Sequence, residues 1–140
     1  MARVFWDTNL FIYLMEGGPF GVQVLLLLER MEERGDRLYT SALTLGELLV
    51  KPSKAGERDM EQEYLDLFRS PKLTVVPFDL RTAPYYARLR RDRTIRPADT
   101  IQLACAAAAE VDLFITNDDR LSKRALPEVK FIASLARAPI

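Results

Sequence analysis

The sequence contains no histidine and a single cysteine, Cys105. Without a second cysteine the chain cannot form an internal disulfide, and without histidine it cannot assemble a structural zinc site from cysteine and histidine ligands. The same absences exclude Ser-His-Asp and Cys-His catalytic triads, and ribonuclease mechanisms that rely on paired imidazoles. Any chemistry must therefore come from carboxylates, hydroxyls, amines or a hard metal ion. Cys105 itself is expected to be a buried structural residue.

The chain also lacks net charge and long apolar runs. Its 20 lysine and arginine residues balance 20 aspartate and glutamate residues, so attraction for a polyanion would require a local basic patch. No apolar run approaches the ~20 residues that span a bilayer, and the N-terminus has no signal-peptide pattern. These features predict a cytoplasmic protein with no membrane association. With 140 residues, the chain is expected to form a single domain over 1–140.

Short apolar segments alternate with helical patterns along the chain. Strands are expected at 3–6, 38–40, 73–76, 113–116 and 129–132, and helices at 9–16, 19–34, 41–50, 60–68, 81–91 and 97–109. The third helix is expected to stop at Lys51-Pro52, because the residue before proline resists the helical conformation, and 53–59 is expected to be a loop. The alternation predicts an α/β fold, a three-layer α/β/α sandwich around a central, mostly parallel sheet of about five strands.

Acidic residues lie close to the ends of these predicted elements. Asp7 ends the first apolar run, and Asp118 follows the fourth strand. In parallel sheets, ligands bind beyond the carboxyl ends of the strands, where the strand order reverses, so these two carboxylates are predicted at one edge. Glu47 lies on the helix after the second strand, and Asp99 lies in the first turn of an alanine-rich helix.

The first two of these acids also have purely structural interpretations. Asp7 can cap the helix that follows it, although Thr8 and Asn9 are equally able to do so. Glu47 ends a Thr-Leu-Gly-Glu segment that matches a capping box, in which the glutamate would only satisfy a backbone donor. Against that interpretation, Ser41 is the better helix start and would leave Glu47 near the second turn.

The other two acids have structural alternatives as well. Asp99 can be a first-turn acid that the helix dipole favours, and Asp118 can be a turn former. Taken together, however, several carboxylates converging at a sheet edge would repel one another unless a cation neutralised them. An oxygen-only cluster suits Mg²⁺ or Mn²⁺. Such an ion allows phosphodiester hydrolysis without histidine.

Four segments resemble, in order and spacing, the acidic motifs of PIN-domain ribonucleases. They are Val4-Phe5-Trp6-Asp7-Thr8-Asn9, Ser41-x-x-Thr44-x-x-Glu47, Arg96-Pro97-Ala98-Asp99-Thr100-Ile101-Gln102-Leu103-Ala104 and Phe114-Ile115-Thr116-Asn117-Asp118. The match spans essentially the whole chain. Its size and compactness are most similar to those of the VapC toxins of bacterial and archaeal VapBC toxin–antitoxin modules.

The resemblance implies a PIN-like fold and an endoribonuclease that hydrolyses RNA phosphodiester bonds with Mg²⁺ or Mn²⁺. It also implies frequent homodimers and a VapB-like antitoxin whose C-terminal segment lies over the active site. By position, the catalytic and metal-binding residues would be Asp7, Glu47, Asp99 and Asp118, supported by Thr8, Asn9, Thr116 and Asn117. Asp119 lies one place beyond the motif and would only assist.

A run of arginines directly precedes Asp99. Such a cluster can hold RNA phosphates beside a metal ion, although a solvated helix end has the same composition. Its members are Arg88, Arg90, Arg91, Arg93 and Arg96. The apolar helices at 19–34 and 60–68 can supply core contacts alone, or also a groove for a partner helix.

Two other functions compete with a nuclease. One is a PIN-like module that binds RNA or protein without cutting. The other is a phosphoryl-transfer domain, either a receiver or a haloacid-dehalogenase-like phosphatase, which would also place an aspartate after its first strand. The phosphatase pattern needs a second aspartate two residues after Asp7, where the chain has Asn9. A receiver would need a paired acid near the start and a lysine after a late strand, and neither is evident.

Overall fold

The computed structural model describes all residues from 1 to 140 and is built on one sheet of five parallel strands. The strands are β1 (Arg3–Trp6), β2 (Arg37–Ser41), β3 (Leu73–Val76), β4 (Leu113–Ile115) and β5 (Ile132–Ala133). Their spatial order is β3-β2-β1-β4-β5. The chain therefore leaves β1 in one direction for β2 and β3, and returns to the other side of β1 with β4. The predicted parallel sheet is confirmed, and its order reverses between β1 and β4.

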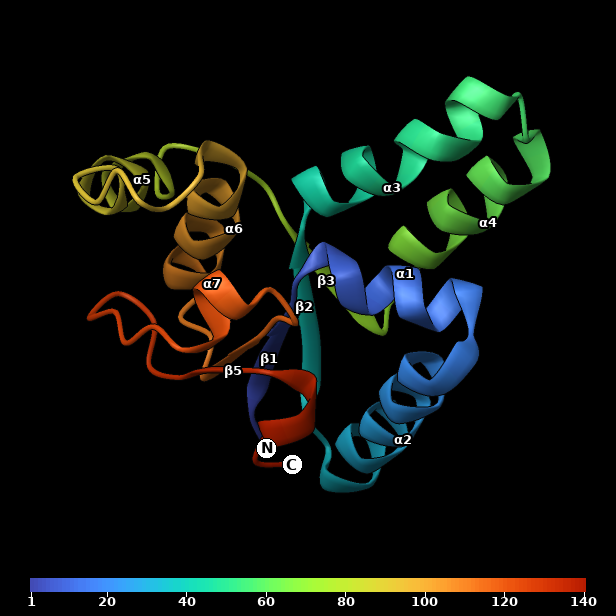
Figure 1. Ribbon diagram of the computed structural model, residues 1–140, viewed down its shortest axis with the longest axis horizontal. Coiled ribbons are helices and arrows are strands. Elements are labelled where there is room, and N and C mark those ends of the chain that lie inside the picture. The colour runs from blue at the N-terminus through green and yellow to red at the C-terminus, as the bar shows by residue number, and fades with distance from the viewer.

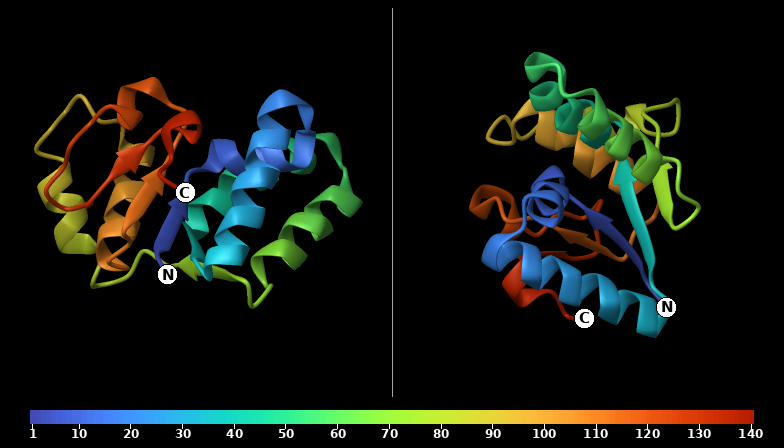
Figure 2. Two further views of the ribbon diagram at one scale, coloured as in Figure 1. Left: turned by 90° about the horizontal axis from the view of Figure 1, so that it is seen from below. Right: turned by 90° about the vertical axis from the view of Figure 1, so that its right-hand side faces the viewer.

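Helices cover both faces of this sheet and complete the predicted three-layer sandwich. Figure 1 shows α1 to α4 on one side and α5 to α7 on the other, and the same layers are visible from below in Figure 2. The helices are α1 (Thr8–Glu16), α2 (Gly18–Arg34), α3 (Ala42–Ala55), α4 (Arg58–Phe68), α5 (Ala83–Leu89), α6 (Pro97–Ala108) and α7 (Asp119–Ser122), followed by a 3₁₀ turn at Leu135–Arg137.

Each face of the sheet has its own apolar core, because successive side chains of a strand point to opposite faces. Trp6 packs with α1 to α4, whereas its neighbour Phe5 packs with α6 on the other face. The Phe5 and Phe114 rings are stacked, with centroids 5.0 Å apart and an interplanar angle of 9°. A strand buried on both faces needs apolar residues at every position, which explains the unbroken run before Asp7.

One predicted boundary was wrong. The third helix does not stop at Lys51-Pro52: α3 continues through Pro52 to Ala55, so most of the expected loop at 53–59 is helical. Proline removes one backbone hydrogen bond from a helix, but Pro52 is buried and its packing offsets that loss. The helix ends instead at Gly56, whose positive φ of 68° permits the left-handed turn that closes it.

The last strand was also misplaced. It was expected at 129–132, but β5 comprises only Ile132–Ala133. Val129 pairs instead with Leu126 in an isolated antiparallel bridge, and its side chain packs in the core on the α6 face of the sheet. The fifth helix is shorter than the expected 81–91, because turns replace its first and last residues. No single helix is long and apolar enough to span a membrane; only α1 and α2 together pass that test, and they are bent by 109°.

Glu110 ends α6 in a conformation that glycine usually adopts. It is the only residue other than glycine with a positive φ, at 54°. Its N–H donates to the Ala107 carbonyl, and the Val111 N–H donates to the Ala106 carbonyl, which together close the helix. A side chain in this conformation is strained, since its Cβ crowds the carbonyl oxygen that follows.

We expect Glu110→Gly to raise the free energy of unfolding by about 0.5 kcal/mol, because relief of this strain exceeds the extra freedom that glycine gives the unfolded chain. Urea unfolding measures the change. Gly56→Ala is the matched control, since it introduces a side chain at the equivalent position of α3 and should lower stability. A decrease in the Glu110→Gly variant would contradict this account of the helix end.

Candidate active site

Asp7 lies at the carboxyl end of β1, beside the point where the strand order reverses. Its carboxylate is only 7% exposed. One oxygen, Oδ1, accepts a hydrogen bond from the Thr8 N–H at 2.8 Å, and the other, Oδ2, accepts one from the Thr116 hydroxyl at 2.7 Å. The strand thus holds a buried carboxylate in one orientation at the sheet edge where ligands bind in open α/β folds.

The environment of Asp7 disfavours its negative charge. The pKa of the Asp7 carboxyl is raised from 3.8 to about 6. Burial is the largest cause, and the charges of Asp99 and Glu47 add to it, whereas the hydrogen bonds from Thr116 and Thr8 act in the opposite direction. Contacts place acids from α3 and α6 beside Asp7: the hydroxyl of the adjacent Thr8 binds Glu47, and Arg96 joins Asp99 to Asp118, which shares Thr116 with Asp7. Three acidic residues that are remote in sequence therefore lie close enough to repel one another, and a bound cation would reduce that repulsion.

The turn after β4 supports Asp7 from the neighbouring strand. Besides donating to Asp7, the Thr116 oxygen accepts a hydrogen bond from the Asp118 N–H at 3.1 Å and one from the Asn9 side chain at 3.4 Å. The Asn9 side-chain oxygen in turn accepts the Asn117 N–H at 3.3 Å. Residues after β1 and β4 thus interlock at the predicted edge.

Glu47 is held by a chain of polar side chains that begins in the core. The Thr8 hydroxyl donates to Glu47 Oε1 at 2.7 Å, and Gln102 Nε2 donates to Thr8 Oγ1 at 3.2 Å. Gln102 is 1% exposed. Its Nε2 also donates to the Thr44 hydroxyl at 2.8 Å, and its Oε1 accepts the Ser41 hydroxyl. Gln102 of α6 therefore links α3 to Thr8 of α1, and Thr8 in turn holds Glu47 on the surface of α3.

Asp99 and Asp118 are joined by Arg96, and Asp118 is also bound by Arg120. Arg96 donates from Nε to Asp99 Oδ2 and from a terminal nitrogen to Asp118 Oδ2, both at 3.1 Å. Arg120 binds Asp118 with two nitrogens, at 3.1 and 3.0 Å. The side-chain hydrogen bonds from Arg120 hold the pKa of Asp118 below its usual value, and the charge of Arg96 adds to this effect.

The structural interpretations of the four acids have different outcomes. Asp7 caps α1 and Asp118 caps α7 through side-chain hydrogen bonds to the backbone, and Asp99 lies in the first turn of α6. The capping box of Glu47 does not form, because Ser41 caps α3 and Glu47 is directed to Thr8. Capping uses one oxygen of a carboxylate and leaves other lone pairs for a cation.

The donor set has the chemistry that Mg²⁺ or Mn²⁺ prefers, since it offers carboxylate and hydroxyl oxygens with no nitrogen or sulfur ligand. The raised pKa of buried Asp7 supports the same conclusion, because a cation would stabilise its charged form. No group of three or more acidic side chains is gathered to hold an ion in this arrangement. Asp99 and Asp118 face Arg96 instead.

The arginines that precede Asp99 do not form one cluster. Arg96 reaches the carboxylates. Arg90 instead donates to the Ile95 carbonyl at 2.9 Å, so it fastens its own loop. Arg91 and Arg93 are exposed. Of this segment, only Arg96 contacts the acidic residues.

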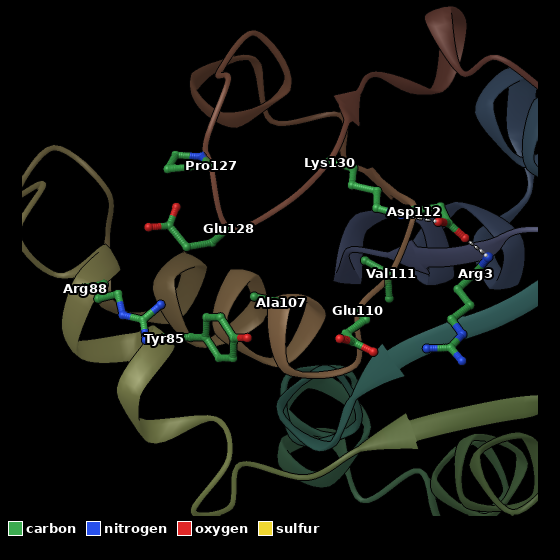
Figure 3. Close-up of a pocket in the computed structure, with 10 residues that line it drawn as sticks. All are labelled: Arg3, Tyr85, Arg88, Ala107, Glu110, Val111, Asp112, Pro127, Glu128 and Lys130. Atoms are coloured by element: carbon green, nitrogen blue, oxygen red, sulfur yellow. Dashed lines mark hydrogen bonds and ion pairs between the residues drawn. The ribbon is translucent and has the colours of Figure 1, made fainter.

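Arg88 lies at a different cavity, of about 630 Å³, near the amino ends of β1, β4 and β5 (Figure 3). Its guanidinium stands over the Tyr85 ring at 5.2 Å. Asp112 is paired there, since it accepts hydrogen bonds from the Arg3 N–H at 2.8 Å and from Lys130 at 3.2 Å, whereas Glu110 and Glu128 line the cavity without an ion pair. This cavity lies at the opposite edge of the sheet from Asp7.

Sequence reasoning missed two residues of this site. Gln102 lies within the motif at 96–104 but is not one of its acids, and Arg120 lies beyond all four motifs. A buried glutamine in an alanine-rich helix was the available signal for the first, because a polar residue there needs partners. Arg120 follows Asp118 by two residues, and only the turn geometry brings its side chain back onto that carboxylate.

Comparison with known proteins identifies the fold of the chain. Over 94% of this chain, VapBC2 from Rickettsia felis bound to a promoter DNA fragment aligns with a TM-score of 0.76, 22% identity and 98% coverage of its own chain. FitAcB from Neisseria gonorrhoeae aligns with a TM-score of 0.61 and 23% identity, over 94% of this chain and 95% of its own. VapBC-5 from Mycobacterium tuberculosis, a member of the VapBC family of toxin–antitoxin systems, aligns with a TM-score of 0.60 and 25% identity. The alignment covers 95% of this chain and 99% of the VapBC-5 chain. No curated protein sequence matches significantly.

The sequence also matches the PIN domain over residues 4–126. This range begins in β1 and extends past α7, so it includes the edge where Asp7 and Asp118 lie and all four acidic motifs. Sequence and fold agree, and the chain belongs to the PIN domain family.

Proposed function

We propose that the protein is a Mg²⁺- or Mn²⁺-dependent endoribonuclease and the toxin of a VapBC-like pair. The observation that carries the proposal is the convergence of the acids at the switch point of a PIN-domain sheet. Asp7 and Asp118 both hydrogen-bond to Thr116, Arg96 joins Asp118 to Asp99, and Thr8, next to Asp7, binds Glu47. An oxygen-only acid set without histidine suits metal-assisted phosphodiester hydrolysis. The solved neighbours, which are toxin–antitoxin complexes, support the subtype.

Asp7, Glu47, Asp99 and Asp118 would hold the ion in this proposal. The ion supplies Lewis-acid polarisation of the scissile phosphodiester and offsets the charge that develops on it. The protein supplies orientation. Thr116 fixes Asp7, Thr8 fixes Glu47, and Asn9 and Asn117 lock the two turns that carry them. Rigid ligands reduce the reorganisation that the site needs when ion and RNA bind.

A VapB-like antitoxin and a second copy of the chain are the proposed protein partners. Support comes from the neighbours, which are VapBC and FitAB complexes, and from the surface of α2. That helix exposes the large apolar residues Phe20, Val22, Leu25 and Leu26. A run of this kind on one helix is typical of an interaction surface.

A non-catalytic PIN module that binds RNA or protein is the second candidate. The observation that favours it is the pairing of Asp99 and Asp118 with arginines, which leaves no acid group gathered for a metal ion.

Cleavage of RNA by the purified protein separates these candidates. We expect the protein to cut a structured RNA with Mn²⁺, to stop when the ion is chelated, and to lose at least about 100-fold in rate when Asp99 is replaced by asparagine, because a charged ligand is removed. The Asp99→Asn protein, purified identically, controls for contaminating ribonuclease. RNA binding with no Mn²⁺-dependent cleavage by the unchanged protein would favour the second candidate.

A further inference from the structure

The two arginines at the candidate metal site have partners that a divalent ion would also need. Arg96 bridges Asp99 and Asp118, and Arg120 closes on the Asp118 oxygens. Both carboxylate side chains are largely covered, at 13% and 16% exposure. A carboxylate with two arginine contacts has few lone pairs left for an ion. Metal and arginine therefore compete for the same oxygens.

The arginine side chains are free to leave. The side chains of Arg96 and Arg120 are 56% and 62% exposed. Ion pairs at this exposure are weak, since water screens them. Moving a guanidinium away from the carboxylates thus requires rotation of an exposed side chain and no change in the core.

The backbone segments that carry these side chains are hydrogen-bonded, in contrast, and Arg124 links one segment to the other. Arg124 donates from Nε to the Arg120 carbonyl at 3.0 Å. Its two terminal nitrogens donate to Asp92 at 2.8 Å and to the Thr94 hydroxyl at 2.6 Å, in the loop before Arg96. Mobile cationic side chains on fixed backbones can change partners while staying beside the site. The fork of an arginine suits a phosphate as well as it suits a carboxylate.

We propose that Arg96 and Arg120 are exchangeable counter-ions, which neutralise Asp99 and Asp118 when no divalent ion is bound and pass to the RNA phosphate when the ion takes their place. The proposal rests on the metal-dependent function proposed above. The two arginines are then phosphate-positioning residues. Each of them weakens metal binding, because it competes with the ion, and strengthens RNA binding, because it contacts the phosphate.

Arg96→Gln and Arg120→Gln in the full chain test this exchange. Titration calorimetry with Mn²⁺ alone should show about 3- to 10-fold tighter binding in each variant, because a competing ion pair is removed. Binding of a phosphorothioate RNA oligonucleotide, which resists hydrolysis, should weaken at least about 5-fold with Mn²⁺ present, because a phosphate contact is lost. Arg69→Gln removes an exposed arginine at the C-terminal end of α4, in no ion pair with the acids of the site, and should change neither quantity.

Conservative variants keep the test informative if charge removal disturbs folding. Arg96→Lys and Arg120→Lys retain the charge but cannot form a forked contact, so both affinities should fall between those of the unchanged protein and the glutamine variant. Unchanged or weaker Mn²⁺ binding in all variants of a protein that itself binds Mn²⁺ and cuts RNA would overturn the exchange and leave the nuclease proposal intact. A protein that neither binds Mn²⁺ nor cuts RNA would overturn both.

Discussion

Asp7→Asn should abolish RNA cleavage and make the metal-free protein more stable. Removal of a charged metal ligand is expected to lower the rate about 10³-fold, since several kcal/mol of transition-state stabilisation depend on the ion. The rise in the pKa of Asp7 from 3.8 to about 6 corresponds to a cost of roughly 3 kcal/mol for the charged form at neutral pH. Asparagine is uncharged and can still cap α1, so this cost disappears.

The net gain should be smaller than that figure. The Thr116 hydroxyl now donates to Asp7 and accepts from Asp118 and Asn9. An asparagine amide turned toward Thr116 would offer a donor where an acceptor is needed. With about 1–2 kcal/mol lost there, we expect a gain of about 1–2 kcal/mol, or roughly 3–6 °C in the thermal midpoint measured with a chelator present.

The pH dependence of this gain identifies its cause. The folded-state pKa of Asp7 is higher than 3.8, so the folded protein binds more protons than the unfolded chain between pH 4 and 6, roughly. The ionised Asp7 therefore lowers the free energy of unfolding of the unchanged protein by its full amount above about pH 6. This destabilisation disappears as the pH falls toward 4 and Asp7 becomes protonated. The difference in thermal midpoint should shrink over that interval.

Asp59→Asn provides the matched control, because it makes the same chemical change on the exposed surface of α4. It should alter neither cleavage nor the pH profile of stability. An Asp7→Asn protein that is no more stable at pH 7.5 than the unchanged protein would mean that Asp7 is not destabilised by burial. Full cleavage by that variant would remove Asp7 from the proposed metal site.

Most of the fold could be predicted because it follows from local pattern and periodicity. The apolar run of β1 and the alanines of α6 are residues that both faces of a buried parallel sheet require. The failures at Pro52 and at β5 have a common cause. A buried proline and an apolar segment near an edge strand depend on tertiary packing, and local preference carries no information about that packing.

The part of the candidate site that depends on the order and direction of the strands could be predicted from the sequence. The rule for ligands in parallel sheets places Asp7 and Asp118 at one edge. Glu47 and Asp99 are candidates from the sequence as well, but only the resemblance to the family assigns them to the same metal site. Side-chain partners were not predictable. Nothing in the sequence says that Arg96 bridges two acids, because that contact depends on where α6 and α7 begin relative to each other.

Gln102 should prove essential to stability and to the placement of Glu47. Gln102→Leu leaves the buried Ser41 hydroxyl without its acceptor and removes one of the two donors to the Thr44 hydroxyl, which still accepts from Thr40. Each unsatisfied group costs about 1–3 kcal/mol, so we expect a loss of about 3 kcal/mol in the free energy of unfolding, measured by urea titration. Thr8 also loses the hydrogen bond that orients it toward Glu47. Loss of such supporting contacts typically lowers metal affinity or activity about 10- to 100-fold.

Thr8→Val separates positioning from stability. The substitution keeps the shape of the side chain and leaves the bonds of Gln102 to Ser41 and Thr44 in place, but it removes the only hydroxyl that holds Glu47. Cleavage should therefore fall about 10-fold with little loss of stability. If Gln102 acts on Glu47 through Thr8, the double variant will cleave no more slowly than Gln102→Leu alone, because the same link is already broken. Multiplicative losses in the double variant would show that the glutamine affects cleavage by another route.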